Sequence, residues 1–271
     1  IFLTMRVSID NTRWWETPLA ALIFFTRLPF WRIAQPDKSC YRRVVEYWPL
    51  AGWITGGLMA ATLYGTSLLF PYPIAVVLAI AVRLLVTGAL HEDGLCDFFD
   101  GFGGGGNDRQ RILDIMKDSR IGTYGVIGLL VYVLLLFFCL YSLPPLTAAI
   151  VIFAGDPFSK MVASQIISMM PYARTESEAK AKVVYRRPPL KSGIGLAVQG
   201  LLPVLALYLW SSHNGILIHW EYLVFAPCIV MYFLYRLIWH RLQGYTGDCC
   251  GALFLLIELS FYLSFVASSN I

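Results

Sequence analysis

Long apolar stretches, separated by short polar ones, dominate the chain. Seven of them approach the roughly 20 residues that a helix needs to cross a hydrocarbon core about 30 Å thick. Strand-like alternation of apolar and polar positions is missing, and in lipid only helices or closed barrels satisfy every backbone group. We therefore predict an all-α fold, a polytopic membrane helical bundle. The expected spans are 48–70, 73–91, 124–143, 145–170, 192–210, 222–239 and 245–267.

The segment 14–31, WWETPLAALIFFTRLPFW, differs from these runs. It is short for a span, and it contains Glu16, Arg27 and two prolines. Tryptophans stand at both of its ends, and aromatic side chains favour the membrane interface. We expect an interfacial or re-entrant helix here, and a spanning helix remains the alternative.

Composition supports a membrane protein. Hydrophobic residues make up 58% of the 271 positions and charged residues only 14%, whereas about 25% is typical of soluble domains. The six cysteines show no C-x-x-C spacing, so we expect neither a zinc site nor a disulfide framework. They are better explained as small apolar core residues.

The positive charges follow a pattern along the chain. The net charge is only +4, but lysines and arginines gather in loops 32–47, 91–122 and 174–191, while the alternate connections between spans contain none. Basic loops of membrane proteins usually face the cytoplasm. We expect one membrane-embedded domain over 1–271 in the plasma (inner) membrane, with an acidic catalytic loop at 91–122 and a basic cytoplasmic loop at 174–191.

An acidic, glycine-rich stretch, HEDGLCDFFDGFGGGG, follows the second predicted span. Asp93, Asp97 and Asp100 are spaced i, i+4, i+7, which places them on one helical face. Asp114 and Asp118, in RILDIMKDSRIG, share a second face. Two acidic faces joined by a glycine turn can close around a shared point, where divalent cations would relieve the repulsion between carboxylates.

Clustered aspartates favour hard ions such as Mg²⁺, which also binds substrate phosphates. Diphosphate cleavage suits such a site, because Mg²⁺ neutralises charge on the leaving phosphate. Arg111 and Arg120 are candidate phosphate contacts, and His91 is a candidate base. Alternatively, this is a solvated turn and His91 an ordinary interfacial histidine.

A second polar stretch, GYTGDCCGALFLLIE, lies at the last predicted span. It holds Asp248 near the start of the span and Glu258 inside it, and carboxylates within membranes are costly and usually functional. Asp248 alternatively caps the helix. Asp156 and Lys160 lie in the middle of a span, either as a structural ion pair at a helix break at Pro157 or facing substrate.

Three function classes compete on these residues. A transporter would place its carboxylates at the midplane, whereas most of the acid here lies in one loop. A Mg²⁺-dependent membrane prenyltransferase would carry its two aspartate motifs far apart in sequence. A CDP-alcohol-type phosphotransferase acting on a diphosphate substrate fits the compact arrangement better, but the alanine-arginine pair expected after the glycine is absent.

Four motifs together resemble the cobalamin synthase family, the adenosylcobinamide-GDP ribazoletransferases. They are FFTRLP at 24–29, GALHEDGLCDFFDGF at 88–102, RILDIMKDSRIGTYG at 111–125 and GYTGDCCGA at 244–252, in the family's order. The resemblance implies a Mg²⁺-dependent membrane transferase of bacteria and archaea. In its reaction, α-ribazole or its 5′-phosphate displaces GMP from adenosylcobinamide-GDP and gives adenosylcobalamin or its phosphate, which completes the nucleotide loop.

The resemblance also implies roles for single residues. The chain departs from the family's usual pattern at Glu92 and at Ser159-Lys160, which weakens any role for Glu92 or Lys160. Partners should be the small-molecule substrates and membrane lipid, with no nucleic acid, and a homo-oligomer stays open. The expected metal ligands are Asp93, Asp97, Asp100, Asp114 and Asp118; the expected catalytic residues are His91, Asp93, Asp97 and Arg120; the expected substrate-binding residues are Arg111, Ser119, Thr246 and Asp248.

Overall fold

Helices build nearly all the regular structure in the computed structural model, which describes residues 13–175 and 183–269. Within these residues the only strand-like feature is a bridge between Tyr172 and Tyr245. The helices, in order, are α1 (Glu16–Phe25), η1 (Phe30–Arg32), α2 (Lys38–Tyr41), η2 (Val44–Tyr47), α3 (Trp48–Ser67), α4 (Tyr72–Thr87), α5 (Leu90–Gly104), α6 (Arg109–Lys117), α7 (Thr123–Tyr141), α8 (Pro145–Ser164), α9 (Ile166–Met169), α10 (Leu190–His213), α11 (Trp220–Leu242) and α12 (Gly247–Ser269).

Five described segments are long and apolar enough to cross a membrane: α7, α8 with α9, α10, α11 and α12. A sixth span arises if α4 and α5, which bend by 90° where they meet, are counted as one. The remaining predicted span, 48–70, corresponds to α3, which has 20 residues but is not among them, since its four glycines and several hydroxyl side chains lower its hydropathy. The all-α, multi-pass prediction is confirmed, with five or six spans found by this measure.

The predicted span 73–91 is too long at its end, because α4 stops at Thr87. Gly88 and Ala89 both have left-handed backbone conformations, with φ of 65° and 54°. A helix of L-residues cannot continue through such a conformation, so the chain turns and starts α5 in a new direction. The side chain of Arg27 packs against Gly88, where a larger residue would not fit. The acidic stretch therefore forms a helix of its own.

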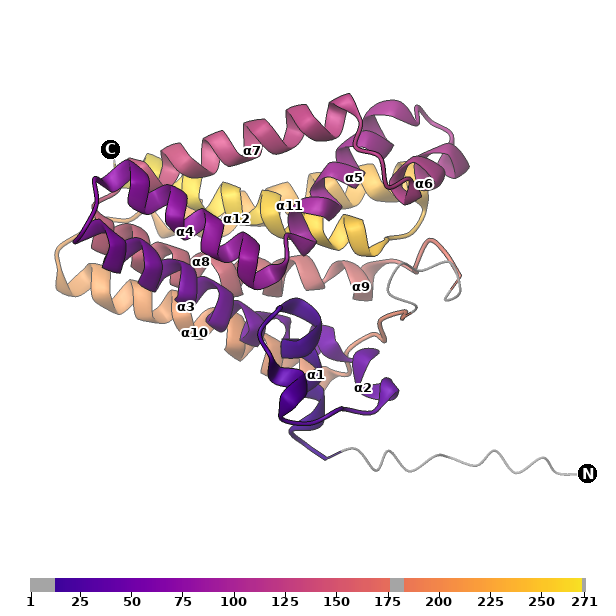
Figure 1. Ribbon diagram of the computed structural model, residues 1–271, viewed down its shortest axis with the longest axis horizontal. Coiled ribbons are helices and arrows are strands. Elements are labelled where there is room, and N and C mark those ends of the chain that lie inside the picture. Colours follow the sequence, from indigo (N-terminus) through magenta and orange to yellow (C-terminus); the bar gives the residue numbers. More distant parts are fainter. Residues whose placement is uncertain (1–12, 176–182, 270–271) are drawn as a thin grey trace, which may run out of the picture.

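The connections alternate between two ends of the bundle. In Figure 1 the basic segments 32–47, 105–122, 171–175 and 183–189 lie at one end, and the short turns before α4, α8 and α11 lie at the other, with the end of α12. Helix α1 also lies at the basic end. Its 10 residues extend about 15 Å, which is half the thickness of a hydrocarbon core. The helix is thus too short to cross the membrane, which agrees with the prediction of an interfacial helix.

Two helices form the centre of the bundle. Most of α8 and α12 is buried inside the protein, whereas α7, α10 and α11 expose most of their apolar surface to the surroundings. Helix α3 packs closely on α8 because Gly52 and Gly56 leave room for Asp156 and the backbone at Pro157. Pro157 does not break α8, which continues through it, so the helix break proposed as one of the two alternatives is wrong.

Candidate active site

The first turns of α5 and α12 touch each other through their backbones. A Cβ on Gly94 would lie 3.1 Å from the Cα of Asp248, and one on Gly251 would lie 3.1 Å from the carbonyl oxygen of His91. Such close approach is possible only where side chains are absent. It brings the acidic stretch of α5 beside the second polar stretch, at the basic end of the bundle.

A cavity of about 860 Å³, counting its open mouth, lies at this junction. Its walls come from α1, from the start of α3, from α5 and α12, and from the segments that follow α9 and precede α10. Its ionisable and hydroxyl-bearing members other than tyrosine and Cys250 are His91, Asp93, Arg174, Thr246 and Asp248. Four expected site residues therefore lie in one cavity with Arg174, an arginine for which the sequence predicted only a place in a basic loop.

His91 lies in the cavity wall and is only 3% exposed. Its ring stacks against Trp48 and Phe25, with centroids 5.9 and 6.3 Å away, and meets Phe254 edge-on at 4.8 Å. Nε2 is buried and has no hydrogen-bond partner among the residues that the structure describes. An unsatisfied buried nitrogen is costly and uncommon, so it usually marks a place where another group binds.

Thr246 and Asp248 have different tasks at the start of α12. The Thr246 hydroxyl accepts a hydrogen bond of 3.2 Å from the backbone N–H of Cys249 and so caps the helix. The alternative that Asp248 serves as the cap is thus wrong. Asp248, two residues farther, lines the cavity beside Asp93.

Arg174 reaches the cavity from the segment after α9. It donates a 2.7 Å hydrogen bond from Nη2 to the carbonyl oxygen of Leu113, which anchors it to α6, and its buried Nε has no partner within the described part of the chain. A guanidinium held in this way can present its remaining N–H groups to an anion. The sequence pointed instead to Arg111 and Arg120. Both are exposed, and neither lines the cavity.

Two tyrosines complete the polar wall. Burial raises the pKa of Tyr172 to about 12, an effect to which the charge of Asp248 adds, and burial also raises the pKa of Tyr185. Both phenols therefore stay protonated at neutral pH, and neither can accept the proton of a substrate hydroxyl as a general base.

The five aspartates predicted to share one point do not converge. Asp100 points away from the cavity to the start of α7, where its two carboxylate oxygens accept hydrogen bonds from the N–H groups of Gly122 and Gly125, at 2.7 and 2.8 Å. The positive end of that helix favours a carboxylate. Asp100 thus acts as the anchor of α7, which corrects its expected place among the metal ligands.

Replacing Asp100 with alanine should destabilise the protein by about 2 kcal/mol, because two N–H groups at a helix start lose their acceptor. Asp100→Asn should cost less, since its amide oxygen still accepts one of the two bonds. Thermal unfolding of the purified variants in detergent measures both. An unchanged melting temperature for Asp100→Ala, together with weaker Mg²⁺ dependence, would instead support the metal role.

Helix α6 carries its own aspartates elsewhere. Asp114 is exposed and accepts a 2.9 Å hydrogen bond from Gln110, in a separate shallow cavity. Asp118 accepts three hydrogen bonds of 2.7 to 3.1 Å from the guanidinium of Arg120, which lowers its pKa to about 2. Ser119, between them, is exposed. Helices α5 and α6 pack against each other where Met116 contacts Gly101, but each α6 carboxylate is held within its own segment, and the described residues form no shared acidic cluster.

The donor set that remains has the chemistry of a magnesium site completed by substrate. Asp93 and Asp248 line one cavity, and Asp97 lies half-buried one turn along α5. Across the described residues no three His, Cys, Asp or Glu side chains come close enough to hold an ion alone. Mg²⁺ commonly takes one or two carboxylates and fills its shell with waters and substrate phosphates. The two cavity carboxylates fit that pattern.

The family model described as cobalamin-5-phosphate synthase matches residues 17–266, which is most of the chain. The chain belongs to the cobalamin-5-phosphate synthase family. It is 37% identical to the adenosylcobinamide-GDP ribazoletransferase of Vibrio parahaemolyticus, over 93% of this chain and 92% of the relative. With the protein of that name from Leptospira interrogans the values are 32%, 94% and 97%, and with that from Shewanella amazonensis 35%, 92% and 94%. No solved structure matches significantly.

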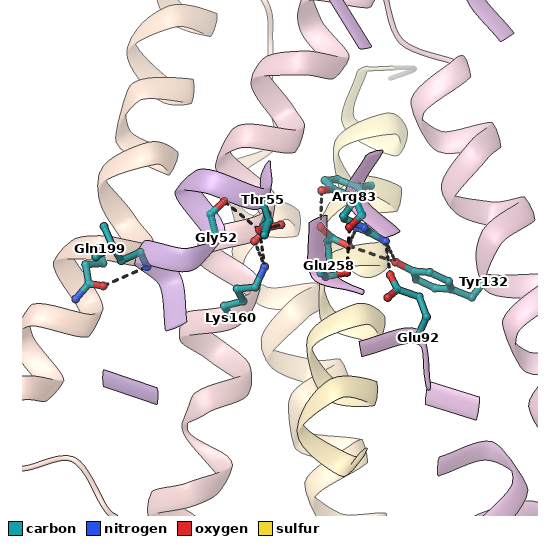
Figure 2. Close-up of polar contacts among 12 residues, drawn as sticks. Gly52, Thr55, Arg83, Glu92, Tyr132, Lys160, Gln199 and Glu258 are labelled. Atoms are coloured by element: carbon teal, nitrogen blue, oxygen red, sulfur yellow. Dashed lines mark hydrogen bonds and ion pairs between the residues drawn. The ribbon is translucent and has the colours of Figure 1, made fainter. Parts of the chain in front are cut away.

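In this cobalamin-5-phosphate synthase family member, Glu92 has a structural role that the sequence did not predict. Glu92 is buried, and its Oε1 accepts a 3.3 Å hydrogen bond from Arg83, which also donates at 2.6 Å to Glu258 and at 2.6 Å to the Tyr132 hydroxyl (Figure 2). Arg83 and Glu258 carry opposite charges and each stands within an apolar run. Because charged side chains inside membranes pair with one another, these two residues could have predicted the buried ion pair.

A second buried polar group lies between α3 and α8. Lys160 forms an ion pair with Asp156, and the Thr55 hydroxyl lies 2.9 Å from Asp156 and 3.0 Å from Lys160 (Figure 2). Lys160 also lies over the ring of Phe254, 4.1 Å from its centroid. Of the two predicted alternatives the structure shows the ion pair, and neither charged residue lines the cavity.

Proposed function

We propose that the cavity is the active site of a Mg²⁺-dependent adenosylcobinamide-GDP ribazoletransferase. Membership of the family and similarity over nearly the whole length to relatives of that name support this activity in cobalamin assembly. The observation that carries the site is the meeting of His91, Asp93, Asp248 and Arg174 in one cavity. A candidate base, two carboxylates and a guanidinium converge there, and each suits a role in diphosphate chemistry.

In the proposed reaction a ribose hydroxyl of α-ribazole, or of its 5′-phosphate, attacks the phosphorus attached to cobinamide. A new P–O bond forms, the P–O bond to the bridging oxygen of the diphosphate breaks, and GMP leaves with that oxygen. The hydroxyl proton passes to Nε2 of His91 or to a neighbouring aspartate. His91 suits this role because its nitrogen has no competing partner and its ring is fixed by aromatic neighbours.

Asp93 and Asp248, with Asp97 nearby, are the residues we propose to hold Mg²⁺. When bound, the ion would neutralise charge that develops on the leaving phosphate. Arg174 would bind a phosphate oxygen from the other side of the cavity through its unpaired Nε–H. The substrate roles predicted for Arg111, Ser119 and Arg120 require a substrate that extends well beyond the cavity.

Incubation of the purified full chain with adenosylcobinamide-GDP, α-ribazole and Mg²⁺ tests the proposal. We expect one GMP for each adenosylcobalamin formed, loss of turnover on chelation with EDTA, and recovery when Mg²⁺ is restored. No GMP under these conditions, with turnover of a prenyl diphosphate instead, would replace this function by that of a membrane prenyltransferase.

We also propose that the basic end of the bundle, and with it the cavity, faces the cytoplasm across the plasma (inner) membrane. The gathering of basic segments at one end supports this orientation (Figure 1). With cysteines introduced at Arg187 and Asn214, an impermeant maleimide added to whole cells should label position 214 and spare position 187, each compared with the unsubstituted chain. The opposite labelling would reverse the orientation.

A further inference from the structure

The cavity has an aromatic wall that the reaction at the phosphorus leaves unexplained. Six ring-bearing side chains line it, three of them half-buried and three fully buried. The half-buried rings, which line the cavity without being fully covered, are Phe24, Tyr172 and Tyr185; the buried ones are Phe25, Trp48 and His91.

The buried rings form a rigid layer behind the open ones. Phe25 and Trp48 stack with centroids 5.4 Å apart, and both stack on His91. Phe24 touches this layer edge-on through Phe25 at 4.9 Å and meets Tyr185 edge-on at 6.1 Å. Open aromatic faces on a fixed support bind a flat ring system by stacking, and such stacking is tolerant of the ring's exact identity.

Both substrates contain a flat base, and the position of His91 decides between them. His91 belongs to the stacked layer and also carries the nitrogen that we propose to accept the proton. In the acceptor, one ribose separates the base from the attacking hydroxyl. In the donor, the guanine is separated from the reacting phosphorus by a ribose and a further phosphate. A base stacked beside the proton-accepting group therefore belongs to the acceptor.

The chemistry of the wall agrees with this choice. The base of α-ribazole, a dimethylbenzimidazole, is largely apolar and carries one ring nitrogen with a free lone pair. Guanine presents several donors and acceptors that need matched partners when buried. A wall made mainly of aromatic rings stabilises the apolar base better than it stabilises guanine.

We propose that Phe24, Tyr172 and Tyr185 form the binding site for the aromatic base of the nucleoside acceptor and so determine which acceptors are used. The inference rests on the proposed function and adds to it the place of one substrate. The acceptor's ribose then extends from the aromatic wall toward His91 and Asp93.

Phe24→Leu removes an open ring, and Phe24→Tyr is the matched control that keeps it. For Phe24→Leu we expect the KM for α-ribazole to rise about tenfold, as loss of one stacked ring implies, with the KM for adenosylcobinamide-GDP within twofold of wild type. Phe24→Tyr should stay within about threefold for both. Tyr185→Leu and Tyr185→Phe provide a second, independent pair with the same expectation.

Direct binding separates this proposal from the proposed function. Titration of α-ribazole alone into the full chain in detergent, followed by calorimetry, should show a Kd that rises about tenfold in Phe24→Leu, whether or not the protein turns over. A rise in the donor KM with an unchanged acceptor KM would assign the rings to guanine and overturn the inference. Unchanged binding of both substrates by the two leucine variants would also overturn it, whereas absent GMP release by wild type would overturn the proposed function alone.

A series of acceptors gives a further check. Wild type should prefer α-ribosides of bicyclic bases over those of monocyclic ones by about tenfold in kcat/KM, because the larger ring stacks over more surface. The preference should shrink in Phe24→Leu and persist in Phe24→Tyr. An undiminished preference in the leucine variant would show that other side chains select the base.

Discussion

Replacing Asp93 with asparagine is expected to lower GMP release about 100-fold at saturating substrates and Mg²⁺. The change keeps the size of the side chain and removes the charge that we propose to hold the ion beside the diphosphate. Loss of one charge-stabilising group in a closed site typically removes about 3 kcal/mol of transition-state stabilisation. Because the interaction strengthens as charge develops, kcat should fall more than the substrate KM values rise.

Asp114→Asn is the matched control for this prediction. The exposed Asp114 lies outside the cavity and bonds Gln110, so its neutralisation should leave turnover within about twofold of wild type. Asp248→Asn should behave like Asp93→Asn. Equal losses in Asp93→Asn and Asp114→Asn would restore the site predicted from spacing, in which aspartates of both helices share the metal.

Replacing Glu258 with alanine is expected to reduce the free energy of unfolding by about 3 to 5 kcal/mol, because Arg83 would lose its closest counter-charge while fully buried. Tyr262 would also lose the acceptor of its 2.8 Å hydrogen bond. Unfolding in mixed micelles of increasing sodium dodecyl sulfate, followed by circular dichroism, measures the loss.

A double variant separates the ion pair from simple packing. In Arg83→Met/Glu258→Met both charges are absent, so the loss should be well below the sum of the two single losses. Glu92→Gln should be mild by comparison, since its contact with Arg83 is the longer one at 3.3 Å. Additive losses in the double variant would mean that the two charges contribute independently and that their pairing is unimportant.

The sequence allowed the helices of the bundle to be predicted well, but not the place where one of them breaks. Apolar runs of membrane length are a strong signal, because lipid imposes the same requirement on every spanning helix. The turn at Gly88 and Ala89 depends on two backbone conformations and on the packing of Arg27, and no apolar pattern records such a contact. In helix α3 the glycines allow close packing on α8, and the same glycines lower the hydropathy of a helix that has membrane length.

For the candidate site, spacing placed the acidic stretch on a helix, but only some of its predicted side chains lie at the cavity. A period of 3.6 residues placed Asp93 and Asp97 on one face of α5, as observed, and the same face carries Asp100 to the start of α7. Which partner each carboxylate finds is decided by neighbouring segments that lie far away in sequence. Arg174 and the aromatic wall were missed for that reason, although FFTRLP, which contains Phe24 and Phe25, stood among the motifs that resembled the family.

Gly94 and Gly251 control the distance between the two carboxylates that lie next to them. The separation of Asp93 from Asp248 is set where two helix backbones meet without any side chain between them. A methyl group at either glycine would push the facing backbone back by a few tenths of an ångström and so widen the gap between the two acids. The two glycines therefore set the geometry of the proposed metal site although they supply no ligand atoms, and replacing either with alanine should lower turnover.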